Sequence, residues 1–379
     1  MRFFKSKAGK IVIWVVVSIM GLMVGVLGCA WMYLTYLSNK SDYIDSEVAL
    51  TAKIKGENGE DLDMNVSEAI ASDTRFTTTK KMHEEDSIHN FLLIGIDSRS
   101  PKYSDGGIGG LADVIMVMSI NEETGSIKMI SIARDCYAHI PSMRDQKINA
   151  AMSRGGAELL KATIEGNLRI KIDGYAFVNF YHMAEVIDSV GGVYCDVTST
   201  EAYGTGGLNH NLRELKYDDL QINQTGYIWL NGKQAVAYAR IRKIDSDYKR
   251  SERQVEVLRS LLDQFMKLSV TGKAAALEDI LELIATNIPS SDIRSYALDF
   301  LPSLKNVSIE YMQLPIEGCF YSGMYGDEWS IRPNWNAMIP YVQKFFYGKT
   351  IDFDPVDDIS SSPSLDKCPK DLKIEDMLK

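Results

Sequence analysis

Recognisable motifs for zinc, for nucleotides and for nucleic acid are missing from this chain of 379 residues. Its five cysteines form no CxxC pair, and His139, His182 and His210 do not have the spacing of metal ligands. The glycine-rich stretch 106–110 is not followed by GK[ST], so it is not a P-loop, and we interpret it as a flexible loop. The net charge of -10 disfavours a broad grip on nucleic acid, which requires a basic surface.

Charged residues are also absent from one long stretch near the N-terminus, residues 11–37. This run exceeds the roughly 20 residues that a helix needs to span a bilayer. Four basic residues precede it, which predicts a cytoplasmic N-terminal tail over 1–10. A cleaved signal peptide is the alternative, but its apolar region is typically only ~7–15 residues long. We therefore expect a single-pass cell-membrane protein whose chain after about residue 38 is extracytoplasmic.

Cysteines on that oxidising side are even in number: Cys136, Cys195, Cys319 and Cys368. Cys136 and Cys195 lie in apolar, strand-like contexts, which are compatible both with a reduced, buried thiol and with a disulfide. Cys319 and Cys368 lie in polar, loop-like surroundings and are the better candidates for a disulfide pair.

With 24% charged and 45% hydrophobic residues, most of the chain is expected to fold. We expect a polar linker over 38–87 with one helix around Asn65–Ser72, and a catalytic domain over 88–270. Residues 271–348 are expected to pack on the same domain, and 349–379 to form a loose tail.

Apolar strands and amphipathic helices interleave along 88–270, which predicts an α/β fold with a mixed central sheet flanked by helices. The expected strands are Asn90–Ile96, Val114–Ile120, Ile127–Ala133, Ala176–Phe180 and Val193–Val197. The expected helices are Ala157–Leu168, Tyr181–Ser189, Lys233–Tyr238 and Tyr248–Leu268. The polar composition of residues 199–224 predicts a surface loop or flap.

Charged residues stand at the ends of the first three strands. The short turn NEETGS predicts a hairpin, in which Asp113 begins one strand and Arg134 ends its partner at the same edge of the sheet. If Asp97 ends a neighbouring strand there, three charged groups meet. Carboxylates beside apolar strands are costly unless they are paired or metal-bound, and two of them with phosphate oxygens suit Mg²⁺.

A second group of charges lies further along the chain. Arg240 and Arg242 would point to the same face of a strand, either around an anion or as a surface pair balanced by neighbouring aspartates. Arg250 and Gln254 are one helical turn apart at the start of a predicted helix, where anions are favoured, and Asp247 is its candidate N-cap. Arg253 should point away from the face shared by Arg250 and Gln254, so it is left outside the site.

Several motifs occur together, in this order: IGIDSR, LADVIMVMSIN, ISIARDCYAHIP, KINAA, VNF, LNGKQAVAYARIRK and DYKRSERQ. This series resembles the LytR-CpsA-Psr family over about residues 88–270, and the membrane span is also similar to that of the family. The chain departs from the family pattern at Ala133, where proline often stands. It departs again at Tyr248 and Lys249, where an aromatic–glycine pair is common.

The resemblance implies a phosphotransferase that moves a glycopolymer, such as teichoic acid or capsule, from a polyprenyl-pyrophosphate carrier to a peptidoglycan hydroxyl. It assigns Arg134, Arg240, Arg242 and Arg250 to the pyrophosphate, and Asp97 and Asp113 to Mg²⁺, with Mn²⁺ as the alternative ion. It places Arg99, Lys147, Asp247 and Gln254 in the surrounding polar shell. Asp113 and Asp247 are candidate bases.

A polyprenyl chain requires a dry apolar groove. Helices Ala157–Leu168 and Tyr181–Ser189 carry more apolar residues than one core-facing stripe needs, so we expect them to line it, with simple packing in a core as the alternative. The sequence also leaves two other functions open. One is a receptor that binds lipid pyrophosphates without catalysis. The other is a membrane-bound transcriptional attenuator, for which the ten-residue cytoplasmic segment is too short to hold a DNA-binding fold.

Overall fold

The computed structural model describes residues 32–36, 39–73, 82–96, 110–245, 247–300, 308–325, 328–353 and 355–356. Its centre is a seven-stranded mixed sheet in the order β1-β12-β9-β4-β5-β6-β13. These strands are β1 (Asp42–Tyr43), β12 (Ala285–Thr286), β9 (Gly174–Asn179), β4 (Ile88–Ile96), β5 (Ala112–Asn121), β6 (Ser126–Ile132) and β13 (Ser308–Leu314). β4, β5 and β6 form an antiparallel meander, while β4–β9 and β6–β13 are parallel pairs. The predicted mixed α/β architecture is therefore present.

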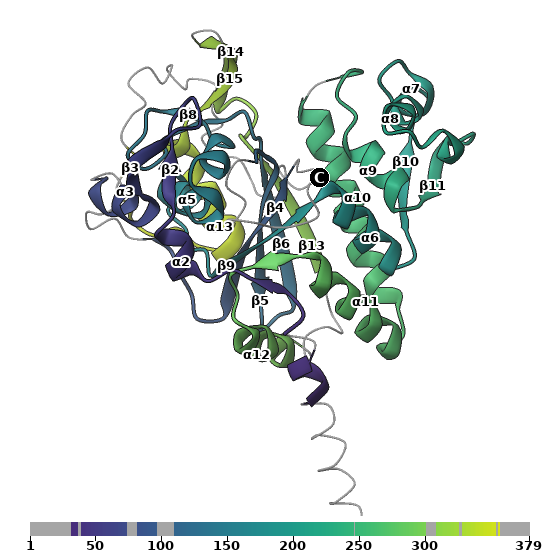
Figure 1. Cartoon of the computed structure of the whole chain (residues 1–379), viewed down its shortest axis with the longest axis horizontal. Helices are drawn as coiled ribbons and strands as arrows, with labels where there is room; N and C mark the ends of the chain where they lie inside the picture. The colour runs from purple at the N-terminus through teal and green to yellow at the C-terminus, as the bar shows by residue number, and fades with distance from the viewer. Residues whose placement is uncertain are drawn as a thin grey trace, which may run out of the picture.

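Helices cover both faces of this sheet (Figure 1). On one face lie α2 (Ser46–Leu50), α3 (Val66–Ser72), α5 (Ala150–Leu168) and α13 (Trp335–Tyr347). On the other lie α6 (Phe180–Ser189), α9 (Gly232–Ala239), α10 (Asp247–Lys267) and α11 (Val270–Leu283). Side chains along β4 alternate between the two faces, as strand geometry requires. Leu92 and Ile94 enter the core with α5, whereas Leu93 faces α10.

A helical lobe with its own hydrophobic core stands on the α10 side of the sheet. It is built from α6, α9, α10 and α11 together with the antiparallel strand pair β10 (Val193–Val197) and β11 (Gly226–Leu230). The stretch 199–224, expected as a loop or flap, is folded instead. It forms α7 (Ser199–Tyr203), α8 (Leu208–Glu214) and the 3-10 helix η3 (Asp218–Leu220). Leu208 and Leu212 are buried in the lobe, and this apolar spacing within a polar stretch is what makes α8 part of the core.

The described parts of the expected linker 38–87, residues 39–73 and 82–87, also pack on the domain. β1 pairs with β12 at the edge of the main sheet, and a small hairpin of β2 (Lys53–Lys55) and β3 (Asp61–Asn65) leads into α3. Ile54, Val66 and Ala69 are fully buried in the main core. Isolated apolar residues in this polar segment are therefore sufficient to anchor it, because each enters the core beside α5.

The remaining elements are two separate two-stranded sheets, β7 (Tyr137–Ala138) with β8 (Gln146–Lys147) and β14 (Phe320–Tyr325) with β15 (Glu328–Pro333), and the helix α12 (Ser290–Phe300). Cys136 and Cys195 are free and buried, and Cys319 is disulfide-bonded. Its expected partner, Cys368, lies outside the described residues, as do most of the expected tail and residues 1–31. Within the described part of the chain, no helix combines the length and the apolar character needed to cross a membrane.

Candidate active site

A polar pocket of about 320 Å³ opens between the end of the β5–β6 hairpin and the helical lobe. Five residues singled out from the sequence line it: Asp113, Arg240, Arg242, Arg250 and Gln254. The other lining residues are Phe180, Asn211, Glu214, Leu215 and Lys243. Four cationic side chains and two carboxylates thus surround one cavity, which is an arrangement suited to a multiply charged anion.

Arg240 and Arg242 reach the pocket from a helix end, and the expectation of a shared strand face was wrong. Arg240 is the C-cap of α9, and its backbone N–H donates to the carbonyl of Val236 at 3.1 Å. A cation at a helix C-terminus is favoured by the helix dipole. The Arg240 guanidinium carbon lies 4.6 Å from the centre of the Phe180 ring, which sets its position over the first residue of α6.

The first turns of α10 supply the opposite wall. Arg250 and Gln254 lie one turn apart and both line the pocket, as their spacing predicted. Arg250 is only 4% exposed. Asp247 is the first residue of α10, but its side chain is outside the described atoms. Lys249, one of the departures from the family pattern, is paired with Glu252 at 2.6 Å.

Arg253 does not line the pocket, in line with its expected direction, yet it supports the site from behind. Its Nε lies 2.8 Å from Glu201, its Nη2 contacts Asp245, and its Nη1 donates to the carbonyl of Ile241 at 2.9 Å. Burial alone would raise the pKa of the Glu201 carboxyl, but hydrogen bonds from Arg253 and Thr198 outweigh it and leave that pKa below its usual value. The sequence analysis missed this supporting role, since Glu201 lies far away in the chain.

The predicted hairpin rim is present. Arg134 Nη1 contacts the Asp113 carboxylate across the end of the β5–β6 hairpin, which brings these two predicted residues together at the same sheet edge. Arg134 Nε also lies 3.4 Å from Asp135, and Lys147 lies 3.1 Å from the other oxygen of Asp135. A chain of alternating charges therefore joins Lys147 to Asp113 through the buried Asp135. The position of Asp135 directly after Arg134 was the only sequence signal for this link.

Asp97 and Arg99 lie outside the described residues, so the second expected metal ligand is not placed here. In the part of the chain that is described, no three His, Cys, Asp or Glu side chains gather in a way that could hold a metal ion. Within the lining of the polar pocket, Lys243 lies 3.0 Å from Glu214 and holds the pKa of that carboxyl below its usual value.

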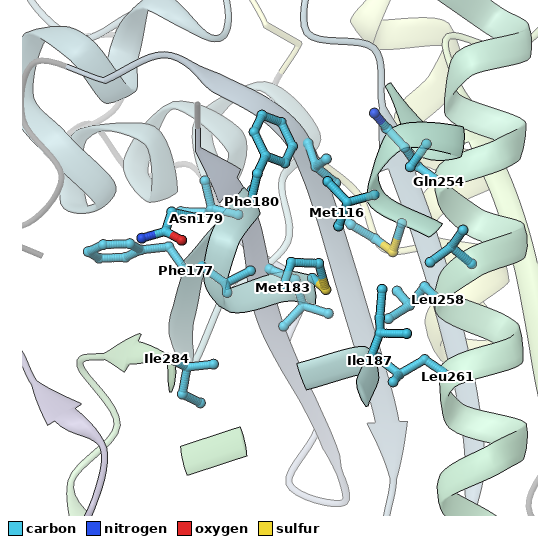
Figure 2. A pocket seen from close by; sticks show the side chains of 18 of the residues that line it. Met116, Phe177, Asn179, Phe180, Met183, Ile187, Gln254, Leu258, Leu261 and Ile284 are labelled. Atoms are coloured by element: carbon cyan, nitrogen blue, oxygen red, sulfur yellow. The ribbon is translucent and has the colours of Figure 1, made fainter. Parts of the chain in front are cut away.

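An apolar cavity of about 260 Å³ adjoins the polar pocket, and Phe180 and Gln254 line both. It lies between the sheet and the lobe, bounded by β4, β5 and β9 on one side and by α6, α9, α10 and α11 on the other. Figure 2 shows Phe180 and Gln254 toward one end, with Leu261 and Ile284 toward the other.

Only one of the two helices expected to line a lipid groove does so. α6 contributes Phe180, Met183 and Ile187 to the cavity. α5 lies across the sheet, where Leu159 and Ile164 are buried in the main core. The surplus of apolar residues on α5 is explained by its burial between the sheet, α3 and α13, which leaves it almost no exposed face.

The sequence matches the model of the LytR_cpsA_psr family across residues 52–339, about three quarters of the chain. The chain belongs to the LytR-CpsA-Psr family. One relative, named polyisoprenyl-teichoic acid–peptidoglycan teichoic acid transferase TagU, from Oceanobacillus iheyensis, is 31% identical over 253 residues. That alignment covers 64% of this chain and 72% of the relative.

Solved structures share the fold of this LytR-CpsA-Psr protein. A structure described as TagT bound to LIIa-WTA matches with a TM-score of 0.55 at 24% identity, over 77% of this chain and 99% of that one. A Streptococcus agalactiae protein matches with a TM-score of 0.59 at 24% identity, over 71% and 91% of the two chains.

One departure from the family pattern has a visible structural consequence. The backbone N–H of Ala133 donates to the carbonyl of Leu314 at 3.0 Å, extending the β6–β13 pairing by one residue. Proline has no N–H and could not make this bond. In this LytR-CpsA-Psr protein, Ala133 therefore ties the segment before Arg134 to β13.

Proposed function

We propose that this protein is a membrane-anchored, extracytoplasmic transferase that moves a glycopolymer from a polyprenyl-pyrophosphate carrier to a peptidoglycan hydroxyl. The observation that carries the proposal is the junction of two cavities at Phe180 and Gln254. One is apolar and suits a hydrocarbon chain, and the other is lined by arginines and suits a pyrophosphate. Relatives in the family that are named teichoic acid transferases support it.

The reaction would proceed at the phosphorus nearer the glycan. The acceptor hydroxyl oxygen forms a bond to this phosphorus, and the bond from the phosphorus to the bridging oxygen breaks. The lipid monophosphate leaves with the bonding electrons, and the hydroxyl proton passes to a base, for which Asp113 and Asp247 are the candidates. Arg240, Arg242 and Arg250 would stabilise the charge on the transferring and leaving phosphates, which is the main catalytic task in such transfers.

The expected metal fits the residues that are present. The Asp113 carboxylate lines the polar pocket with its side chain 20% exposed. Mg²⁺ commonly takes only one or two protein carboxylates together with substrate phosphates and water, so a larger cluster is unnecessary. Asp113, with Asp97, would hold the ion, with Mn²⁺ as the alternative. When bound, it would supply positive charge to the phosphate oxygens.

Contacts at the end of the apolar N-terminal run and just after it support the proposed membrane anchor. Lys40 lies 2.6 Å from Glu278 and 2.5 Å from Glu282 on α11, and the Tyr36 hydroxyl donates to Glu278 at 3.1 Å. α11 also contributes Ile280 to the wall of the apolar cavity. An anchor in 11–37 would therefore hold the lipid-binding helix close to the bilayer from which a polyprenyl substrate comes.

The deciding experiment is a turnover assay with the full-length protein in detergent. A synthetic polyprenyl-pyrophosphate glycan serves as donor and peptidoglycan as acceptor, and the release of polyprenyl phosphate and the labelling of the acceptor are both measured. Stoichiometric appearance of the two products is expected. Tight binding of the donor without turnover would replace the transferase with a non-catalytic lipid-pyrophosphate receptor.

A further inference from the structure

An aromatic surface lies on the solvent side of the β10–β11 strand pair, away from the polar pocket. Tyr194, Tyr227 and Trp229 form it, with exposures of 38%, 72% and 48%. Tyr194 faces Trp229 across the two strands, and Tyr227 lies diagonally beside Tyr194. The alternate residues of β10 are buried in the lobe, so strand geometry places the aromatic side chains together outside. Three large exposed aromatic side chains on one short pair of strands indicate a binding surface.

The aromatic rings are held in place before any ligand binds. The Tyr194 and Tyr227 rings stack with centroids 5.5 Å apart and an angle of 21°. The Trp229 indole N–H donates to the carbonyl of Gly191 at 2.9 Å. Gly192, at a φ of +88°, leaves room for this indole, since a Cβ there would lie 2.4 Å from its nitrogen. A preordered surface loses little side-chain entropy on binding.

Two hydrogen bonds attach β10 to α10, the helix that carries Arg250 and Gln254. The backbone N–H of Tyr194 donates to Ser260 at 2.8 Å, and that of Asp196 donates to Glu256 at 2.6 Å. The aromatic surface and the polar pocket therefore lie on different sides of the same rigid helix. A ligand bound on these strands is therefore held at a fixed position relative to the reacting groups.

A groove of about 400 Å³ runs between this surface and α10. Besides Tyr194 and Tyr227, it is lined by Glu252, Val255, Glu256, Arg259, Ser260, Asp263 and Tyr311. The lining holds three carboxylates and one guanidinium. Lys249 pairs with Glu252, and Glu256 accepts hydrogen bonds from the Asp196 N–H and the Tyr238 hydroxyl, so Asp263 is the carboxylate with the most acceptor capacity for a ligand. Burial raises the pKa of the Glu256 carboxyl. The groove therefore combines flat aromatic faces with hydrogen-bond acceptors.

From these features we infer that the groove and the aromatic surface bind an uncharged glycan strand, the sugar backbone of the acceptor. This inference rests on the proposed transferase function. The flat C–H faces of pyranose rings can cover the aromatic rings, while sugar hydroxyls donate to the carboxylates. A phosphate-rich glycopolymer would be repelled by the same carboxylates, so the surface selects the acceptor strand and not the donor polymer.

A membrane surface fits this region less well. Anionic lipid headgroups attract basic segments, and here the aromatic rings are bordered by acids. In Figure 1, residues 32–36 lie at the bottom of the molecule, whereas β10 and β11 lie at the upper right, away from that end. The strands β10 and β11 therefore lie away from the end of the molecule at which residues 32–36 lie, which is the end nearest the proposed anchor.

The test measures binding of chitohexaose, a neutral oligomer of N-acetylglucosamine, to the full-length protein in a non-ionic detergent by calorimetry. Tyr227→Ala is expected to weaken the affinity about tenfold, since each aromatic contact contributes on that order. Trp229→Ala is the second variant. Tyr203→Ala is the matched control, because Tyr203 is 53% exposed on α7 outside the groove. Thermal melting verifies that each variant folds.

Chitohexaose binding that Tyr227→Ala weakens and Tyr203→Ala preserves would support the inference. Absence of binding to the unmodified protein, or equal affinity in Tyr227→Ala, would overturn it. So would Tyr227-dependent binding of poly(glycerol phosphate) or of phosphatidylglycerol vesicles in place of chitohexaose. A parallel transfer assay separates this from the proposed function: Tyr227→Ala should transfer normally to a soluble disaccharide acceptor but poorly to polymeric peptidoglycan. A protein that transfers to neither acceptor before mutation would refute the transferase proposal alone.

Discussion

Arg253 donates a hydrogen bond from Nη1 to the carbonyl oxygen of Ile241 at 2.9 Å, and Ile241 is the residue between Arg240 and Arg242. A buried arginine that contacts no part of the polar pocket thus fixes the backbone from which two pocket arginines project. The same guanidinium contacts Glu201 and Asp245, so it joins α7, the α9–α10 connection and α10.

Arg253→Lys should therefore reduce turnover and stability together, because lysine cannot serve three acceptors in this geometry. The loss of stability should approach, without reaching, the ~3–5 kcal/mol typical of removing one partner from a buried ion pair. Urea unfolding and the transfer assay measure the two effects. Arg213→Lys, at an exposed position on α8, should change neither. Unchanged turnover in Arg253→Lys would show that the Ile241 backbone needs no such support.

Arg240 is expected to be essential for turnover. Removing its contact to a pyrophosphate should cost at least ~2 kcal/mol of transition-state stabilisation in Arg240→Ala. Arg240→Lys should also be impaired, since the planar fork and its stacking on Phe180 are lost. The assay compares kcat/KM for both variants with Arg213→Ala. Near-normal turnover in a folded Arg240→Ala protein would remove this residue from the site.

Activity is expected to require Mg²⁺ or Mn²⁺ and to vanish in chelator. Asp113→Asn should raise the metal concentration needed for half-maximal activity, because a neutral amide is a weaker ligand than a carboxylate. It also removes the negative partner of Arg134, so the metal titration is the informative measurement and not activity at one concentration. An Asp113→Asn enzyme with reduced activity but an unaltered metal requirement would mean that Asp113 only positions Arg134.

Narrowing the apolar cavity should select against long lipid chains. Ala176 lines the cavity from β9, and Ala176→Leu would fill part of it without displacing a buried polar group. We expect weaker turnover with long polyprenyl donors and nearly normal turnover with short-chain analogues. Ala71→Leu on the exposed face of α3 is the control. Equal loss with donors of every chain length would argue that the cavity does not hold the lipid.

The thiols of Cys136 and Cys195 should resist modification in the folded protein. Both side chains are fully buried, and burial raises the pKa of each thiol well above its usual value, so almost no thiolate is present at neutral pH. Reaction with a disulfide reagent at pH 8 should become fast only after unfolding. Rapid labelling of either position, identified by peptide mass, would reveal an opening of the core that the structure does not show.

Much of the secondary structure could be predicted from the sequence because it depends on local patterns. Alternating and helical apolar periods located β4, β5, β6, β10, α6 and α10 to within a few residues. The short turn between two apolar strands correctly placed Asp113 beside Arg134. The spacing of Arg250 and Gln254 placed them on one helix face for the same reason, since four residues make about one turn.

Other features depended on contacts between distant segments. Apolar periodicity shows that a helix buries a face but not what covers it, so α5 and α6 looked alike although they lie on opposite sides of the sheet. The polar composition of 38–87 and 199–224 concealed a few apolar residues that anchor both segments. The end of α9 was located to within one residue, but Arg240 and Arg242 were expected on a strand, and residues 240–245 form a turn and irregular backbone instead.

The sequence by itself determined the residue types that gather at one end of the sheet, because charges at strand ends and helix starts must lie at the edges of the elements that carry them. Only the tertiary structure decided that the arginine-lined pocket joins an apolar cavity at Phe180 and Gln254. A cavity is the space left when two layers pack incompletely, so it belongs to no single element. No local pattern of residues encodes where it lies.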